Sequence, residues 1–219
     1  MKKIATVRSP FKEKFGIPRQ SGLVAVKGEI IFEREYSRIE AFNGLDGFSH
    51  IWVLWEFSEN LNKEWSPCVR PPRLGGNKRV GVFASRSPFR PNPIGISCLK
   101  LNDISVENDR VVLKVEGVDM LDGTPVYDVK PYVAFTDSIP DAVGGFSDKV
   151  KDYSLSVNYD ERIFDGFATE FKSEVLKILE NDPRPSYQDD PERIYGVNFS
   201  GKEIKFKVNE LILTILSIE

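Results

Sequence analysis

The residues best suited to bind a charged ligand lie in one proline-rich stretch, Arg86-Ser87-Pro88-Phe89-Arg90-Pro91-Asn92-Pro93-Ile94-Gly95. Each proline fixes its own φ and restricts the residue before it, so the stretch is expected to be a stiff loop. Such a loop presents Arg86, Arg90 and Asn92 in a fixed arrangement, so little conformational entropy is lost when a ligand binds. Because a guanidinium matches the oxygens of phosphates and carboxylates, we predict an anionic ligand here.

The sequence contains few residues or motifs for metal binding, dinucleotide binding or hydrolysis. His50 is the single histidine, and Cys68 and Cys98 lie far apart without the spacing of metal ligands. We therefore expect no metal site and two reduced structural thiols. The glycine-rich motifs of Rossmann dinucleotide sites and of P-loops do not occur in the sequence. Hydrolysis that uses His50 stays open as a third hypothesis, with no nucleophile motif to support it.

Positive charge is concentrated in two stretches, although the net charge of the chain is only -3. Residues 1–28 hold seven Lys or Arg and one Glu, and residues 65–102 hold seven Lys or Arg, five of them Arg, with no Asp or Glu. Positive side chains that lie this close together repel one another unless an anion binds between them. Solvated surface charge is the alternative, but the length of the second stretch and its arginines favour a nucleic acid or a nucleotide.

The first two-thirds of the chain reads as short strands without helices between them, which predicts an antiparallel β-barrel. In the strand at residues 50–57, the side chains of Ile51, Val53, Trp55 and Phe57 share one face and should enter the core. The other expected strands cover residues 22–32, 79–84, 94–101 and 110–118. The long connection at residues 58–78 is expected to be functional.

A second, smaller unit is predicted after a loose linker at residues 136–160. Phe164, Phe167, Phe171, Val175 and Ile178 keep helical spacing, and the prolines near residue 183 end the helix. Three strands follow, at residues 195–199, 204–208 and 211–215. We thus expect a mainly β protein with a barrel domain at 1–140 and a small α+β domain, one helix and a three-stranded sheet, at 160–219.

The composition suits a globular protein, with 41% apolar and 29% charged residues. No apolar run approaches the roughly 20 residues of a membrane helix, and the first residues lack the apolar stretch of a signal peptide. We therefore expect a cytoplasmic protein that makes no membrane contact.

Several blocks of the sequence resemble the TsaA-like (TrmO) family in order and spacing. These blocks are Ser9-Pro10-Phe11 to Pro18-Arg19-Gln20, Phe48-Ser49-His50, Arg70 to Gly76, Arg86 to Gly95, Asp122-Gly123-Thr124-Pro125 to Asp128-Val129-Lys130-Pro131-Tyr132, and Asp182-Pro183-Arg184-Pro185-x-Tyr187. Together they are specific, and they cover nearly the whole chain.

The resemblance implies a homodimeric β-barrel methyltransferase, unrelated to Rossmann enzymes, with S-adenosylmethionine (SAM) as its cofactor. The implied reaction is N6-methylation of threonylcarbamoyladenosine next to the anticodon of a tRNA, at adenine 37. The acceptor nitrogen is a poor nucleophile, so a carboxylate that takes its proton would help. Asp119, Asp122 and Asp128 are equal candidates for this base.

The family pattern also implies binding residues. For the cofactor it points to Arg19, Gln20, Ser49, His50, Arg86, Ile96, Gly117, Asp119 and Asp122. Arg86 is the strongest of them, as a partner for the methionine carboxylate. His50 could equally be a structural histidine, and Asp122 could serve its own turn. For tRNA we predict contacts from Lys12, Lys14, Arg70, Arg73, Arg90, Asn92, Lys130 and Arg184.

A noncatalytic RNA-binding barrel remains the alternative function, and SAM binding separates it from the enzyme. The predicted homodimer has one argument of its own besides the resemblance. The apolar strand at residues 211–218 would need cover if it lay at the edge of its sheet.

Overall fold

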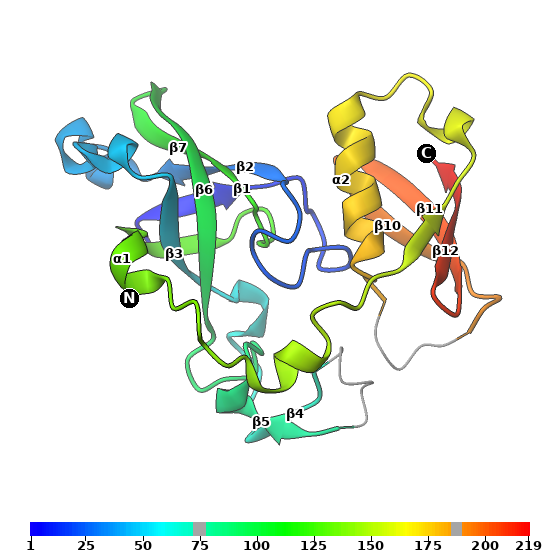
Figure 1. The fold of residues 1–219 in the computed structure, drawn as a ribbon. Coiled ribbons are helices and arrows are strands. Elements are labelled where there is room, and N and C mark those ends of the chain that lie inside the picture. Colours follow the sequence, from blue (N-terminus) through cyan, green and yellow to red (C-terminus); the bar gives the residue numbers. More distant parts are fainter. Residues whose placement is uncertain (72–77, 185–189) are drawn as a thin grey trace.

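The computed structural model describes residues 1–71, 78–184 and 190–219, and Figure 1 shows a barrel beside a smaller helix-and-sheet unit. The barrel is closed and its strand pairs are all antiparallel, in the order β1-β2-β7-β6-β3-β8. Its strands are β1 (Ala5–Arg8), β2 (Lys27–Phe32), β3 (His50–Glu56), β6 (Ile94–Glu107), β7 (Arg110–Glu116) and β8 (Pro125–Pro131). The predicted mainly β fold with an antiparallel barrel is confirmed.

Alternation of apolar residues places β3 in the barrel wall, as the sequence predicts. Ile51, Val53 and Trp55 are buried, whereas the residues between them are only half-buried. Burying each such side chain contributes roughly 1.5 to 3 kcal/mol, which is enough to fix the register of the strand. Phe57 lies beyond the end of β3 and packs against the ring of Trp55.

Other barrel elements differ from the sequence-based prediction. Only residues 80 and 81 of the expected strand at 79–84 form a strand, β5 (Val80–Gly81), and residues 82–84 form a 3-10 turn. The expected strand at 22–32 begins only at Lys27. Two barrel strands were not predicted, because β1 is four residues long and β8 begins and ends in proline.

The smaller unit contains α2 (Thr169–Glu180) and a sheet in the order β10-β11-β12-β9. Its strands are β9 (Ser156–Asn158), β10 (Tyr195–Phe199), β11 (Lys202–Asn209) and β12 (Ile212–Ile218). The sheet has four strands instead of the predicted three, because β9 from the linker pairs in parallel with β12. The edge argument for a dimer is therefore weakened, since β9 covers residues 212–214 of the edge of β12 that was expected to be open.

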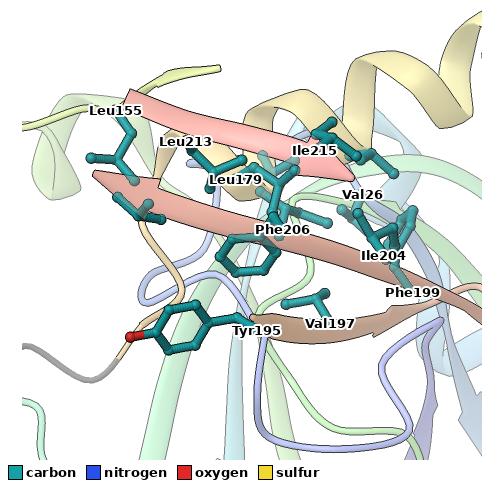
Figure 2. Close-up of a cluster of buried hydrophobic side chains, with 14 of the residues drawn as sticks. Val26, Leu155, Leu179, Tyr195, Val197, Phe199, Ile204, Phe206, Leu213 and Ile215 are labelled. Carbon is teal, nitrogen blue, oxygen red and sulfur yellow. The ribbon is translucent and has the colours of Figure 1, made fainter. Parts of the chain in front are cut away.

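The core of the smaller unit also holds residues from the N-terminal part of the chain. Figure 2 shows Val26 among the side chains of α2 and the sheet, and Phe11 and Val24 belong to the same buried cluster. Gly16 fits closely here, since a Cβ at this residue would lie 2.7 Å from Cγ1 of Val197. The segment at residues 11–26 thus packs its apolar side chains against the C-terminal unit while it leads to the barrel strand β2.

Three short elements lie outside the two cores. A two-stranded ribbon pairs β4 (Cys68–Val69) with β5, and α1 (Ala134–Asp137) follows β8 (Figure 1). Cys68 and Cys98 are free thiols, as expected. Among the described residues, no helix is long and apolar enough to cross a membrane.

Candidate functional site

One end of the barrel gathers polar side chains from distant parts of the sequence. The start of β6 supplies Ser97, the segment after β7 supplies Asp119, and the segment before β2 supplies Gln20 and Ser21. Arg86 approaches the same place from the proline-rich loop and donates a hydrogen bond to Oε1 of Gln20. We call Gln20, Ser21, Arg86, Ser97 and Asp119 the mouth cluster.

A chain of hydrogen bonds anchors the mouth cluster in the barrel core. Nε1 of buried Trp55 donates to Oγ of Ser97 at 2.9 Å, and that hydroxyl donates to Oδ1 of Asp119 at 2.6 Å. Gly95 makes room for the indole, since a Cβ there would lie 2.3 Å from the ring. Trp55 and Ser97 are both buried, so the carboxylate is held in one orientation by residues that cannot easily move.

The environment of Asp119 favours its neutral form more than water does. Burial raises the pKa of this carboxyl from 3.8 to about 6, against the hydrogen bonds from Ser97 and from the backbone of Asp119 and Ser21 and the charge of Arg86. A carboxyl with this pKa is mostly ionised at neutral pH and can still accept a proton readily. Asp119 therefore has the protonation behaviour that a general base needs.

Arg86 offers a cation beside this carboxyl. Its side chain is exposed, and it forms no ion pair within the described part of the chain. Ile96 is exposed on the opposite, outer face of β6 from Ser97, where it adds an apolar surface. Gly117 precedes Asp119 with a φ of 91°, and its carbonyl accepts a hydrogen bond from the amide of Gly22, which ties the two segments of the mouth together.

Two further predicted cofactor residues come from β3 and from the residue before it. Ser49 and His50 stand at the start of β3, and Oγ of Ser49 lies 2.9 Å from Nδ1 of His50. In the register of β3 with β6, His50 pairs with Lys100 and Val53 pairs with Ser97, so His50 lies three residues along the strand from the mouth cluster. Among the described residues, no hydrogen bond or ion pair joins Ser49 or His50 to Arg86, and their role in cofactor binding stays a prediction.

The three candidate bases are separated clearly. Asp122 accepts a hydrogen bond from the amide of Ser9 and forms a 2.6 Å ion pair with Lys12, so it braces the N-terminal segment. Asp128 pairs with Lys130 at 2.8 Å and lines a cavity of about 670 Å³ at the far end of the barrel. Asp119 is the candidate that lies in the mouth cluster.

Arg19 and Arg184 are used inside the protein. Nη2 of Arg19 donates at 2.9 Å to the carbonyls of Asp182 and Arg184, so it fastens the segment that follows α2. Arg184 is 7% exposed, and its Nε and Nη2 donate to the two carboxylate oxygens of Asp182 at 2.9 and 3.0 Å. Tyr153 donates to the same carboxylate. The predicted roles of Arg19 in cofactor binding and of Arg184 in direct tRNA contact receive no support from this arrangement.

The remaining predicted tRNA residues differ in how their charges are used. Lys12, Lys14 and Lys130 each form an ion pair, with Asp122, Glu59 and Asp128 respectively. Arg70 and Asn92 are exposed. Arg90 is half-buried and donates to the carbonyls of Val82 and Ser85. Arg73 lies outside the described residues.

Sequence reasoning missed Ser21, Ser97 and Trp55 as members of the site. A signal existed for Ser97, because it is a polar residue at an inward-facing position of a strand whose inward neighbours are Gly95 and Leu99. Buried polar groups need partners, so this residue pointed to a second polar group nearby. No comparable pattern marks Ser21.

Comparisons with known proteins agree with this architecture. Residues 6–138 match the tRNA-methyltransferase O N-terminal domain, and residues 161–219 match the TrmO C-terminal domain. The chain is 38% identical to the tRNA (adenine(37)-N6)-methyltransferase of Escherichia coli, over 99% of this chain and 96% of that protein.

A second relative and a solved structure extend the match. A Pseudomonas aeruginosa protein, provisionally named an S-adenosylmethionine-dependent methyltransferase, is 39% identical over 89% of this chain and 86% of its own length. The crystal structure of TrmO from Pseudomonas aeruginosa superposes with a TM-score of 0.75 at 30% identity, over 99% of this chain and 97% of that one. This chain therefore belongs to the TrmO family.

Proposed function

We propose that this chain is a SAM-dependent methyltransferase that methylates N6 of adenine 37 in a tRNA. The observation that carries the proposal is the mouth cluster, where a rigid carboxylate with a pKa of about 6 lies near the guanidinium of Arg86. The names of full-length relatives support the same reaction. These names also favour the enzyme over the noncatalytic RNA-binding barrel. A match of fold alone would not distinguish the two functions.

The residues at the barrel mouth fit the cofactor in chemical type. Arg86 is exposed and has donors that can meet the methionine carboxylate, because its bond to Gln20 uses only Nη1. Ile96 supplies apolar contact area on the outer face of β6, and Asp119 supplies a negative charge on the inner side. We therefore assign Arg86, Gln20, Ile96 and the Gly117–Asp119 segment to SAM, and this assignment remains a proposal.

When bound, SAM supplies a methyl group on a sulfonium sulfur, whose carbon–sulfur bond breaks as the new bond to N6 forms. The work of the protein is to align the two partners and to take the proton that leaves N6. We assign the proton to Asp119, whose Oδ1 accepts the hydrogen bond from Ser97. Trp55 and Ser97 orient this carboxylate, so they act as positioning residues.

The test is binding and methyl transfer by the intact chain. Calorimetry with SAM and with S-adenosylhomocysteine should give micromolar binding, and labelled methyl should appear in tRNA. A tRNA whose adenine 37 is replaced by guanine serves as the matched control and should receive no label. Absence of SAM binding at millimolar concentration would exclude the enzyme and leave the noncatalytic barrel. Label in the control tRNA would show that another nucleotide is the substrate.

The finer substrate and the location of the protein are part of the same proposal. We propose that the adenine carries the threonylcarbamoyl group, and that the protein acts in the cytoplasm with residues 1–140 as the SAM-binding unit and 160–219 as the C-terminal unit. A tRNA prepared without threonylcarbamoylation gives the test. Equal methylation of both tRNAs would show that the modification is not required.

We also propose a homodimer, now on a different surface from the one expected. The outer face of the barrel near α1 exposes Phe135, Ile139 and Val143, with exposed fractions of 89, 64 and 89%. Trp52 holds α1 against the strands through a 2.9 Å hydrogen bond to Asp137. Exposed apolar residues on an ordered face are typical of an interface between copies. A monomeric mass in light scattering at micromolar concentration would contradict this proposal.

A further inference from the structure

A large aromatic side chain stands almost fully in solvent beside the mouth cluster. Phe83 is 73% exposed in a 3-10 turn, between buried Val82 and exposed Ala84. Fully exposing a phenylalanine forgoes roughly 2 kcal/mol of burial. The turn ends two residues before Arg86, so the ring and the arginine proposed to bind the cofactor belong to one short segment.

The backbone around Phe83 is rigidly held. The amide of Val82 donates to the carbonyl of Pro67 at 3.0 Å, and Oγ of Ser85 donates to the carbonyl of Val82 at 2.9 Å. Nη1 of Arg90 then joins the turn from outside, with bonds of 3.0 and 2.7 Å to the carbonyls of Val82 and Ser85. The ring is thus presented by a fixed turn and does not belong to a loose loop.

Arg90 also meets the ring itself. Its guanidinium carbon lies 5.5 Å from the centroid of Phe83, within the range of a cation–π contact. With one side of the ring against this cation and most of the side chain in solvent, a flat π surface is left available for a ligand. Base stacking on aromatic side chains requires a surface of this kind.

The surroundings of Phe83 are positively charged. Arg70, Lys78, Arg79 and Arg86 are exposed, and within the described ranges none of them is in an ion pair. The whole stretch at 65–102 lacks Asp and Glu. An uncharged partner or an ordinary apolar protein surface gains nothing from these cations, whereas phosphates on either side of a stacked base would neutralise them.

We propose that Phe83 is a stacking platform for an unpaired base of the substrate tRNA, next to the base that is methylated. This inference rests on the proposed function and names how the same site holds its RNA. The bases next to adenine 37 in a tRNA loop are unpaired and can stack on an aromatic ring. Phe83 would hold such a neighbour while Arg90 supports the ring from its other side.

The test compares variants of Phe83 in the intact chain, with the tRNA that the parent methylates. Phe83→Ala should weaken tRNA affinity about 5- to 150-fold, which corresponds to the loss of one stacked base. The dependence of affinity on salt should keep its slope, because no phosphate contact is lost. SAM affinity should stay at the parent value.

Two further substitutions separate stacking from simple apolar contact. Phe83→Trp keeps a π surface and should bind tRNA at least as well as the parent, whereas Phe83→Leu keeps bulk without a π surface and should behave as the alanine variant. Val106→Ala is the matched control, because Val106 is 59% exposed at the hairpin between β6 and β7 and should leave tRNA binding unchanged.

Three results would overturn the inference. They are parent-like tRNA affinity in Phe83→Ala, full rescue by Phe83→Leu, and a change of molar mass in Phe83→Ala, which would assign the ring to an interface between copies. A parent chain that methylates no tRNA refutes the proposed function instead. The two failures are therefore distinguishable.

Discussion

Replacing Asp119 with asparagine should lower activity and raise stability at the same time. Asn has the same shape as Asp and can still accept the hydrogen bond from Ser97, which is 2.6 Å long in the parent. What the substitution removes is the negative charge that burial disfavours. The two consequences differ in sign because the same charge costs folding free energy and serves the proposed proton transfer.

The stability effect has a defined pH window. The folded pKa of Asp119 is about 6, above its ordinary value of 3.8, so the folded state prefers the protonated form. The charge therefore costs nothing below about pH 4, and the cost grows as pH rises to about 6 and is complete above it. A shift of this size corresponds to roughly 3 kcal/mol at pH 8, as an upper value.

The activity effect follows from the same pKa. About nine-tenths of Asp119 is ionised at pH 7 and about one-tenth at pH 5, so kcat/KM of the parent should fall about tenfold between these values. In Asp119→Asn, kcat/KM should no longer rise between pH 5 and 7. At pH 7 it should be about 10² to 10⁴ times lower than in the parent, the usual contribution of a general base. Ser97→Ala removes a hydrogen bond that lowers the pKa of Asp119, so the rise of kcat/KM with pH should move to higher pH in this variant.

Denaturant unfolding of parent and Asp119→Asn between pH 4 and 8 measures the first effect, and methyl transfer over the same range measures the second. The free energies of unfolding should agree near pH 4 and separate as pH rises, with the variant more stable. If the difference is constant with pH, or if the parent is the more stable protein at pH 8, Asp119 is not a buried carboxyl with a raised pKa. Asp46→Asn, on an exposed turn, should change neither quantity.

The other predictions concern the positive residues. Arg86→Ala should weaken SAM binding about 10- to 100-fold by calorimetry with an unchanged circular dichroism spectrum, as for a lost charge-assisted hydrogen bond at an exposed site; parent-like affinity would remove Arg86 from the cofactor site. Arg184→Ala should lower the unfolding free energy by about 3 kcal/mol or more, because its buried carboxylate partner is left unpaired; a smaller loss in urea melts would contradict this. Changing Arg70 and Arg79 together to Ala should reduce the slope of log tRNA affinity against log salt by about 1.4 to 1.8, whereas Lys130→Ala, already ion-paired, should change it less.

Sequence alone predicted the barrel well because its long strands carry a strong alternating pattern. Ile51, Val53 and Trp55 entered the core as the period of two requires. The short strands were missed, because a four-residue strand such as β1 has too few positions to show alternation. The strand β9 was also hidden in the linker, since its pairing with β12 is a long-range contact that no local pattern records.

The sequence predicted which residue types the candidate site needs but could not choose among the three aspartates. Asp119, Asp122 and Asp128 are the same residue type in one stretch of sequence, yet only Asp119 reaches the mouth cluster. Sequence gives the type of a side chain but not the partner that occupies it. Lys12 reaches Asp122 through a long-range ion pair that depends on the folded chain, whereas Lys130 pairs with Asp128 locally, two residues away on β8.

The same distinction explains why a chain with a net charge of -3 can serve an RNA partner. Positive residues that are paired with nearby carboxylates, as Lys12 and Lys14 are, add little to the field that RNA meets. The segment at 65–102 contains no acid of its own, so its exposed arginines keep their charge available. We therefore expect the position of these unpaired cations around Phe83, and not the total charge, to determine where a polyanion binds the barrel. Reversing the charge of a remote surface should then change tRNA binding far less than reversing this one.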